Sequence, residues 1–462
     1  MLMETRRISI GIFLLVVGLY TALGQEAYKN YDIGSYRLPD ITRNELDFSV
    51  NSEGKFSDMS ESDVVSGSIM GNFDVTFNRY RNARTFRGTQ QASVALSGQY
   101  AKDQQEAKMR YYDVGLYYTN SSRFYGDDYE GLFFETGGKA SFLAEGTKRF
   151  GDGADQPRNN TSKVLELSVP LRVGKGRIER VEDARQAIYI LENLSKRKVL
   201  SRELTGEEID AFARVISAVK NKRFFDARLR LIDEVTAVDS FLVASGALAS
   251  GGAAYFTTLY DYWMYGDLFE RKSGTEISGG VRPVFYYDKA DMDYEDYAIR
   301  DYGTKQLGSG VIADVRLDYE KPTSLYWQHS AYAQLYGRYN YYNYKRFEHD
   351  ESWPLTTKRD VYVAGLSGSY AFGYYPNSRT NVNFGVRENL TWQKFNERDS
   401  YEDYDPFVSS RTDLFLNLYY YFSPQLRLAA EGNLGYQYSG QENIDYSRWT
   451  GNFVLTLTYS LF

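Results

Sequence analysis

The C-terminal stretch of the chain alternates between two kinds of side chain. In residues 449–462 (WTGNFVLTLTYSLF), every second position from Trp449 to Leu461 is apolar or Gly. The positions between them carry Thr, Asn or Ser, apart from Val454 and the final Phe462. Because successive side chains of a β-strand point to opposite faces, this stretch predicts a strand with one apolar face and one polar face.

The same alternation recurs along most of the chain. It appears in the segments 43–55, 64–80, 89–101, 107–119, 131–147, 162–174, 271–287, 305–320, 325–343, 359–374, 381–392, 413–422 and 426–438. Together with the C-terminal stretch, these segments predict an all-β, antiparallel protein of about 14 strands.

The connections between the later strands are of two kinds, which alternate. Tight turns that contain Pro lie at 320–324, 375–379 and 423–425, and long polar loops lie at 288–304, 344–358, 396–410 and 439–447. Short turns at one end and long loops at the other are typical of transmembrane β-barrels, with the turns in the periplasm. A secreted all-β protein, the alternative, has little reason to sort its loops in this way.

The N-terminus has the pattern of a secretory signal peptide. Arg6 and Arg7 precede an apolar run over 8–23, and small residues lie at a cleavage site before Gln25. We therefore expect residues 1–24 to be a signal peptide, with an uncleaved anchor as the alternative. No later stretch approaches the roughly 18 consecutive apolar residues of a spanning helix, so a membrane location would depend on strands.

One segment has a different period. From Gly176 to Ala247 the apolar residues recur with the helical period of 3.6, which predicts three amphipathic helices. The second of them begins with a capping box from Thr205 to Glu208. In a barrel with an even number of strands, both ends of the chain lie on the periplasmic side. Counted back from the C-terminus, the connections alternate between periplasmic turns and outer loops, and the insertion falls on a periplasmic connection. The predicted organisation is an N-terminal periplasmic segment (25–42), a first barrel half (43–175), the helical insertion (176–263) and a second barrel half (264–462).

Composition is consistent with an envelope protein. The chain has 43 Tyr and 27 Phe, and aromatic girdles are a feature of transmembrane barrels. It has no Cys, which excludes disulfides and thiolate metal sites. The net charge of -7 argues against a nucleic-acid partner, because such proteins show a basic footprint.

These features together resemble the outer-membrane β-barrel proteins of Gram-negative bacteria, of a porin-like type with a helical periplasmic insertion. The resemblance covers the signal peptide and nearly all of the remaining chain except 176–263, and it implies a bacterial outer-membrane location with lipid as a partner. The chain departs from the pattern at Phe462. A terminal aromatic residue is usually in phase with apolar residues, but here the preceding in-phase residues are Ser460, Thr458 and Thr456.

Charged residues in the strands are expected to face the lumen. An Arg or Lys on the lipid face costs about 2–4 kcal/mol at mid-membrane, and the alternation puts these residues in the opposite phase. The predicted lumen-lining residues are Asp314, Arg316, Arg338, Arg387, Arg427 and Glu431, and Asp113, Lys139, Glu145, Glu276, Arg282 and Asp318 share their phase. One interpretation is a ladder of ion pairs that fills a closed interior. The other is a hydrated pore whose arginines favour anions.

Glu388 is an exception to this rule, because it occupies the lipid-facing phase of its strand. Either a local bulge or a partner on a neighbouring strand would explain it, and the sequence does not decide between them.

Sites for metals, cofactors or catalysis are not predicted. The acidic loop from Asp291 lacks an EF-hand pattern, because Asp296 stands where Gly is needed and Tyr302 where Glu is needed. The segment 173–176 lacks the spacing of a phosphate-binding loop. The two histidines, His329 and His349, have no nucleophile motif beside them, so we expect no enzyme activity.

A basic patch marks the helical insertion. Lys220, Lys222 and Arg223 lie close together, either as a solvated helix face or as a contact for anionic lipid or a periplasmic protein. The predicted function is a channel or uptake porin for small solutes, gated or partnered through the periplasmic insertion. The alternative is a plugged, non-transporting barrel that serves as an envelope scaffold or assembly protein.

Overall fold

The computed structural model describes most of the chain in thirteen ranges. They are residues 28, 30–57, 66–103, 106–126, 128–151, 157–222, 227–266, 269–294, 301–348, 355–398, 405–423, 426–441 and 444–459. The predicted signal peptide, Arg223, Asp296, His349 and Phe462 lie outside these ranges.

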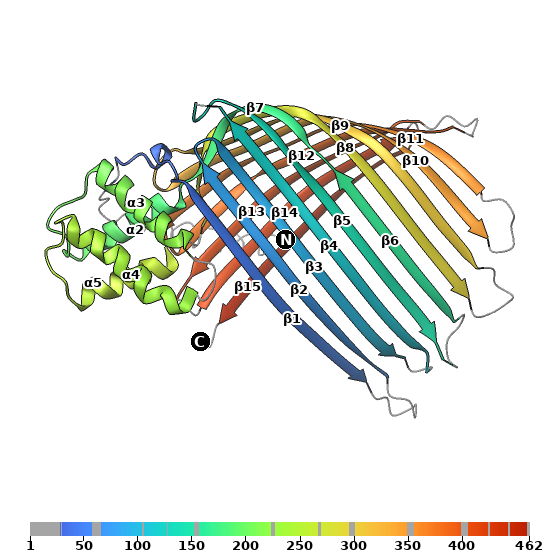
Figure 1. The fold of residues 1–462 in the computed structure, drawn as a ribbon, viewed down its shortest axis with the longest axis horizontal. Helices are drawn as coiled ribbons and strands as arrows, with labels where there is room; N and C mark the ends of the chain where they lie inside the picture. Colours follow the sequence, from blue (N-terminus) through green and yellow to red (C-terminus); the bar gives the residue numbers. More distant parts are fainter. Residues whose placement is uncertain are drawn as a thin grey trace, which may run out of the picture.

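The described strands form one antiparallel sheet that curves into a barrel (Figure 1). Its fifteen strands are β1 (Ile41–Ser57), β2 (Ser66–Ala83), β3 (Phe86–Lys102), β4 (Lys108–Tyr125), β5 (Leu132–Phe150), β6 (Arg158–Ser168), β7 (Leu171–Arg180), β8 (Lys272–Tyr294), β9 (Tyr302–Pro322), β10 (Trp327–Glu348), β11 (Leu355–Asn377), β12 (Thr380–Glu397), β13 (Phe407–Tyr421), β14 (Leu426–Gln441) and β15 (Ile444–Tyr459). Strands that are neighbours in sequence are hydrogen-bonded neighbours in the sheet, except at β6 and β7. Each predicted strand segment overlaps a strand of this sheet.

Strands β6 and β7 share one position in the sheet. Both pair with β5 on one side and with β8 on the other, one after the other along the same line. They are separated by Val169 and Pro170. Because Pro has no backbone N–H to donate to the ladder, it interrupts the strand. The fifteen strands therefore occupy fourteen sheet positions, and this interruption explains why the predicted count of about 14 differs by one.

The apolar phase of the strands covers the outer face of the sheet. Val315, Leu335, Leu366 and Leu390 pair in register across β9 to β12, and each is more than 40% exposed. The intervening positions therefore face the interior. A continuous exposed apolar band is what contact with lipid requires.

Glu388 lies on this outer face and has partners on the neighbouring strand. Its carboxylate accepts hydrogen bonds from the hydroxyls of Ser410, at 2.9 Å, and Thr412. The register between β12 and β13 is continuous there, so the partner explanation is confirmed and no bulge is involved. Two hydroxyl donors offset part of the cost of removing a carboxylate from water.

The insertion between β7 and β8 contains four described helices rather than three. They are α2 (Glu182–Lys196), α3 (Gly206–Asn221), α4 (Ala227–Ala244) and α5 (Ala253–Tyr265). The prediction missed α5 because this segment is apolar on most sides and has no clear stripe. The capping box is confirmed: Thr205 Oγ1 accepts from the Glu208 N–H, and the Glu208 carboxylate accepts from the Thr205 N–H.

The start of the insertion at Gly176 was predicted six residues too early. Gly176 to Arg180 continue β7 against β8. Gly176 adopts a φ of 99°, and a Cβ there would lie 2.0 Å from the Thr275 carbonyl oxygen. The close approach of the two strands requires a glycine at this position. Gly176 therefore belongs to the strand and does not lead into a helix.

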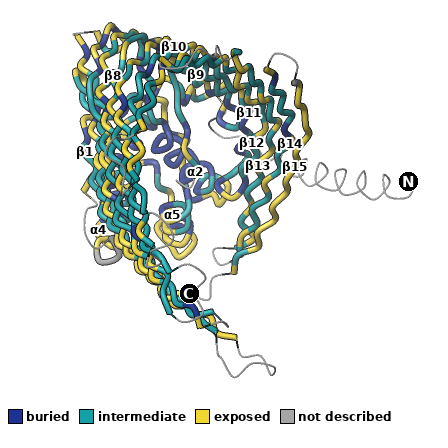
Figure 2. The backbone as a smooth tube through the Cα atoms, turned by 90° about the vertical axis from the view of Figure 1, so that its right-hand side faces the viewer, coloured by how far each residue is buried: buried dark blue, intermediate teal, exposed yellow. Residues whose placement is uncertain are grey.

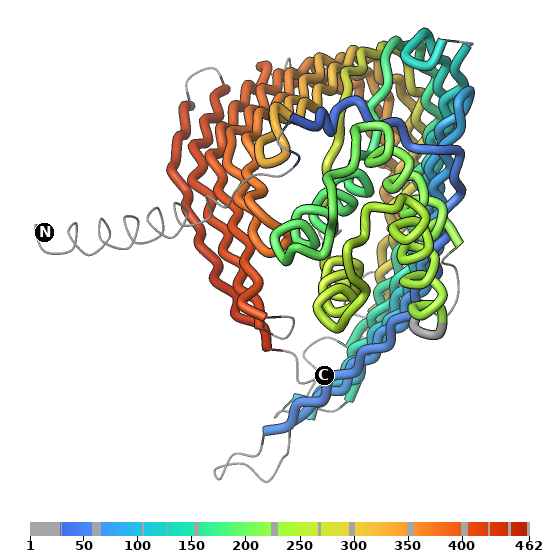
Figure 3. The backbone as a smooth tube through the Cα atoms, turned by 90° about the vertical axis from the view of Figure 1, so that its left-hand side faces the viewer, coloured from blue at the N-terminus to red at the C-terminus, as the bar shows by residue number. Residues whose placement is uncertain are grey.

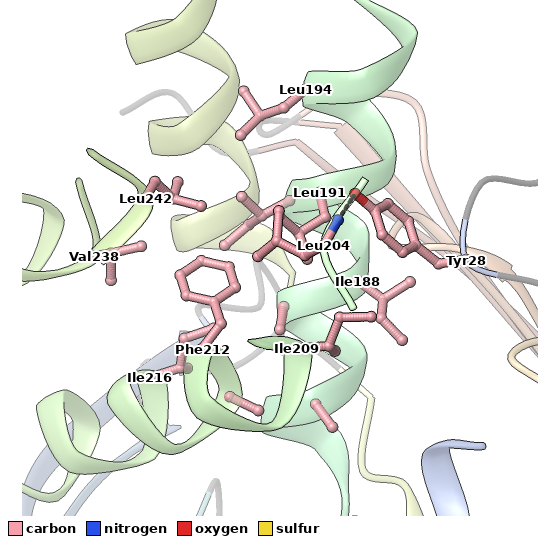
Figure 4. Close-up of a cluster of buried hydrophobic side chains, with 14 of the residues drawn as sticks. Tyr28, Ile188, Leu191, Leu194, Leu204, Ile209, Phe212, Ile216, Val238 and Leu242 are labelled. Atoms are coloured by element: carbon pink, nitrogen blue, oxygen red, sulfur yellow. Dashed lines mark hydrogen bonds between the residues drawn. The ribbon is translucent and has the colours of Figure 1, made fainter. Parts of the chain in front are cut away.

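The helices pack together at the end of the barrel that carries the short turns (Figures 1 and 3). Their shared core includes Ile188 and Leu191 of α2, Phe212 of α3 and Leu242 of α4, all fully buried (Figure 4). The N-terminal segment 30–40 crosses the same mouth and adds Tyr36 to this core (Figure 3). We call these four helices and segment 30–40 the cap. None of the helices in the described ranges is both long and apolar enough to cross a membrane.

Strands β1 and β15 are the two edges of the sheet, and no hydrogen-bonded pairing joins them among the described residues. Exposed strand edges favour further pairing, and fourteen positions make these two strands antiparallel to each other. We therefore expect β1 and β15 to pair and close the barrel. The absence of Cys makes this testable with introduced disulfides.

Lumen-facing Asn51 of β1 should be replaced by Cys together with one residue of β15, either Thr450, Asn452 or Val454. Three pairs are tested because the register between β1 and β15 is not known in advance. Oxidation is expected to give an intramolecular disulfide in one of these pairs, seen as a reductant-sensitive mobility shift of the denatured monomer. Asn51→Cys with Asn417→Cys on β13 is the control and should not crosslink, because disulfides need Cα atoms within about 7 Å. Crosslinks formed only between two molecules would contradict closure.

Candidate functional site

A chain of charged side chains crosses one wall of the lumen from β3 to β10. In order of contact it runs through Arg87, Glu276, Arg123, Glu135, Arg172, Asp314 and Gln334. Its members come from seven strands and all face inward, opposite to the exposed apolar phase. We call this chain the ion-pair ladder.

Glu276 is at the centre of the ion-pair ladder. Its carboxylate accepts from Arg87 Nη2 at 2.9 Å and from Arg123 Nη1 at 2.6 Å, and it is only 2% exposed. Arg123 also donates to Glu135 at 2.7 Å. A buried carboxylate is stable only when cations and hydrogen bonds replace its water, and two guanidinium groups do so here.

On the other wall of the lumen, three of the inward-facing charged residues are exposed. Arg387, Arg427 and Glu431 face inward, yet the side chain of each is exposed. The Arg387 guanidinium lies 4.2 Å from the centre of the Phe415 ring, and Arg427 contacts the hydroxyls of Tyr419 and Tyr421. The inner face of β12 to β14 is therefore accessible at these three positions. We call this side of the lumen the open wall.

The structure distributes the six predicted lumen residues over both walls. Asp314 belongs to the ion-pair ladder, where it accepts from Arg172 at 2.6 Å. Arg316 donates to both carboxylate oxygens of Asp318, and Arg338 donates to the Tyr342 hydroxyl at 3.1 Å. Arg387, Arg427 and Glu431 lie on the open wall. The first three of these residues thus have polar partners, and the other three are exposed on the inner face of the opposite wall.

The cap is anchored to the barrel through one buried carboxylate. Asp183 in the first turn of α2 accepts from Lys220 Nζ at 2.8 Å, from Arg43 Nη2 of β1 at 2.9 Å and from Ser217 Oγ at 2.5 Å. Burial alone would raise the pKa of Asp183. The charges of Lys220 and Arg43 and the hydrogen bonds from Lys220 and Ser217 outweigh burial and lower its pKa to about 2.

This geometry corrects the predicted basic patch. Lys220 is 6% exposed and is held by Asp183, so it cannot meet a lipid headgroup or a partner protein. Its burial follows from the position of α3, which packs against the start of α2. Lys222 is exposed at the end of α3, and Arg223 lies outside the described ranges. Within this set, Lys222 is the described residue that is accessible.

Two buried arginines lie at the barrel mouth, Arg271 just before β8 and Arg185 in the cap. Arg271 donates to the Gln328 side chain at 2.6 Å and to the Leu325 carbonyl at 2.9 Å. Arg185 of α2 lies over the rings of Tyr189 and Tyr326, 3.9 Å and 5.2 Å from their centres. Its guanidinium is buried without a hydrogen-bond partner in the described part of the chain, so ring contacts provide its stabilisation there.

Within the cap, the N-terminal segment joins the helices to the barrel. The Tyr36 hydroxyl lies 2.9 Å from Ser217 Oγ, and the Tyr31 hydroxyl donates to Asp210. Asn82 of β2 donates to the Leu38 carbonyl. Sequence reasoning assigned this segment only to the periplasm and missed its packing role. The run of tyrosines at 28, 31 and 36 was the available signal.

Figure 2 views the barrel from the end opposite the cap and shows α2 and α5 across the far opening. His329, considered above for catalysis, faces outward from β10, where its ring contacts Tyr370 and Phe372. Within the described ranges, no three His, Cys, Asp or Glu side chains form a group that could hold a metal. The features that distinguish the interior are therefore its two unlike walls and its covered mouth.

Comparison with family models and with curated protein sequences found no match. Among solved structures, the ferric yersiniabactin uptake receptor FyuA from Yersinia pestis is 8% identical, over 88% of this chain and 63% of that chain, with a TM-score of 0.37. This chain thus spans less than two thirds of the length of that receptor. The translocator domain of the autotransporter NalP from Neisseria meningitidis is 8% identical, over 99% and 98%, with a TM-score of 0.27.

OmpT, an outer membrane protein of Vibrio cholerae, is 11% identical over 90% of this chain and 99% of that chain, with a TM-score of 0.23. The chain resembles outer-membrane β-barrel proteins. At these TM-scores the resemblance carries no conclusion about activity, and the functional argument depends on the two walls and the cap.

Proposed function

We propose that the protein is an outer-membrane channel or uptake barrel for small solutes, in which the cap controls one mouth. The observation that carries this proposal is the exposure of inward-facing Arg387, Arg427 and Glu431. Exposed charges hold water, and a hydrated lane along β12 to β14 would provide a path for polar solutes. The ion-pair ladder on the other wall stiffens the barrel.

The orientation follows from the loops. The cap lies at the end that carries short turns such as 84–85, 323–326 and 378–379. Short turns face the periplasm in outer-membrane barrels. We therefore place the cap in the periplasm, where it can meet soluble proteins.

The contacts of the cap support a gating role. On one side of the mouth the cap is held by Asp183, which accepts from Arg43 of β1, and by Arg185, whose guanidinium lies over the Tyr326 ring. Phe269, in the linker between α5 and β8, contacts the open wall through its ring, whose centre lies 5.5 Å from that of Tyr419. Strong attachment on one side and a ring contact on the other suits a hinged cover.

Conductance in planar bilayers tests the proposal. We expect a low conductance for the full chain and a clearly higher one when residues 182–265 are replaced by a short Gly-Ser linker, because the cover of the mouth is removed. Folding of both proteins is checked by the mobility difference between unheated and heated samples in gels. A folded barrel that passes no current in either form would overturn the proposal.

That negative result would favour the second candidate, a non-transporting barrel that acts as an envelope scaffold. The ion-pair ladder and the cap, which together fill one wall and cover one mouth, are the observations that favour it. In that case exposed Lys222 on the cap would be the residue from which to search for a periplasmic partner.

A further inference from the structure

The ladder wall contains a pocket that the ladder itself does not use. It has a volume of about 310 Å³ and opens into the lumen between β5, β6, β8, β9 and β10. Its charged lining residues are Lys139, Glu166, Arg282 and Arg338. Arg282 and Arg338 are near the middle of β8 and β10, so the pocket lies at mid-height in the barrel.

Glycines of β9 make room for the side chains of β10 that line this pocket. A Cβ on Gly310 would lie 2.0 Å from Asn340 Oδ1, and one on Gly308 would lie 2.7 Å from Cδ1 of Tyr342. Any other residue at these positions would push Asn340 and Tyr342 out of place. Because Gly308 and Gly310 have no side chains, Asn340 and Tyr342 of β10 can lie across the wall at these positions.

The charges in the pocket do not balance. Lys139 pairs with Glu166 at 3.1 Å, which leaves the two arginines without a carboxylate. Arg338 donates to the neutral hydroxyl of Tyr342, and the Nε atoms of Arg282 and Arg338 are buried with no hydrogen-bond partner in the described part of the protein. On the ion-pair ladder, in contrast, every arginine contacts a carboxylate.

The neighbouring acids do not supply the missing charge. Asp288 accepts from the Tyr286 hydroxyl at 3.1 Å, and Asp314 is held by Arg172 and Gln334. Buried cationic donors without an acceptor are costly. A planar guanidinium is matched best by an oxyanion, such as a carboxylate or a phosphate, that accepts two hydrogen bonds.

We propose that this pocket binds the oxyanion group of a small solute, with Arg282 and Arg338 as its ligands. Tyr286 and Tyr342, which meet edge to face with ring centres 6.3 Å apart, form the rim on which the rest of the solute lies. The proposal that the solute is in transit rests on the proposed channel function, whereas binding itself does not.

Calorimetric titration of the purified full chain in detergent micelles tests binding, with inorganic phosphate and succinate as probes. Binding is expected for at least one probe, with the preference identifying a phosphate or a carboxylate ligand. Arg282→Gln and Arg338→Gln should each weaken it by about tenfold, the size of effect expected when one charged hydrogen-bond donor is lost. Arg282→Lys should keep part of the affinity, since it retains the charge.

Two further variants separate a built pocket from general attraction to positive charge. Gly308→Ala places a Cβ 2.7 Å from Cδ1 of Tyr342, so it displaces the rim of the pocket without changing any charge and should also weaken binding. Arg379→Gln removes an exposed arginine from the turn between β11 and β12 and should leave binding unchanged. Folding of each variant is checked by heat-dependent gel mobility.

The outcomes distinguish this inference from the channel function. No binding of either probe to the folded full chain, or undiminished binding to the Arg282→Gln, Arg338→Gln double variant, overturns the pocket. If current passes while neither probe binds, the channel stands and the pocket is wrong. If a probe binds and no current passes, the pocket stands and the channel is wrong.

Discussion

Asp183→Ala is expected to release the cap from the barrel mouth at a cost of about 3–5 kcal/mol in the free energy of cap docking, the usual effect of removing one partner of a buried ion pair. The side chain is 1% exposed and holds Lys220 of α3 and Arg43 of β1 at the same time. Its loss would leave both cations buried without this partner. Limited proteolysis of the folded barrel measures the effect, because a released cap is cleaved between its helices.

Asp233→Ala is the matched control, since Asp233 is exposed on α4 and its removal should leave the proteolysis pattern unchanged. If the cap of Asp183→Ala resisted protease as well as the original cap does, the anchoring role of Asp183 would be wrong. In the bilayer experiment, Asp183→Ala is expected to raise the conductance of the full chain, because it releases the cap.

The same carboxylate predicts a dependence of cap docking on pH. The pKa of Asp183 is lowered to about 2 from a reference of 3.8. A group with a lowered pKa in the folded state contributes stability above its unfolded pKa and loses that contribution as pH falls through the folded value. Docking should therefore weaken between about pH 4 and pH 2, by roughly 2 kcal/mol in total, and Asp183→Ala should lack this step.

The strands could be predicted because their signal is local. Alternation from Trp449 to Leu461 reports the two environments of a single strand and requires no knowledge of its neighbours. The fourth helix, α5, could not be predicted in this way, since a helix that is apolar on most sides has no stripe. The break at Pro170 was visible in the sequence, but only the pairing with β5 and β8 shows that the strand resumes.

The candidate site was less predictable because its contacts are not local. The phase of a strand shows that Glu276 faces inward, but it does not show that Arg87, 189 residues earlier, donates to it. Lys220 looked like a surface cation because a helix pattern does not reveal which face another helix covers. Its partner Asp183 lies 37 residues away, and only the packing of α2 on α3 brings them together.

A second large effect is expected for Glu276→Gln, which removes the charge at the centre of the ion-pair ladder. Arg87 and Arg123 would then share a neutral amide, and we expect the barrel to lose about 3–5 kcal/mol of stability, because each guanidinium is at most 16% exposed. Denaturant titration followed by gel mobility measures the change.

Glu431→Gln is the informative comparison, because it removes the same charge from the open wall. Its carboxylate is exposed, so the stability change should stay within about 0.5 kcal/mol. Its effect should instead appear in transport, as an increased preference for anions when ion selectivity is measured in salt gradients. Two results would contradict the division of the lumen into a supporting wall and a conducting wall. One is a Glu276→Gln barrel that is as stable as the original. The other is a Glu431→Gln barrel with unchanged ion selectivity.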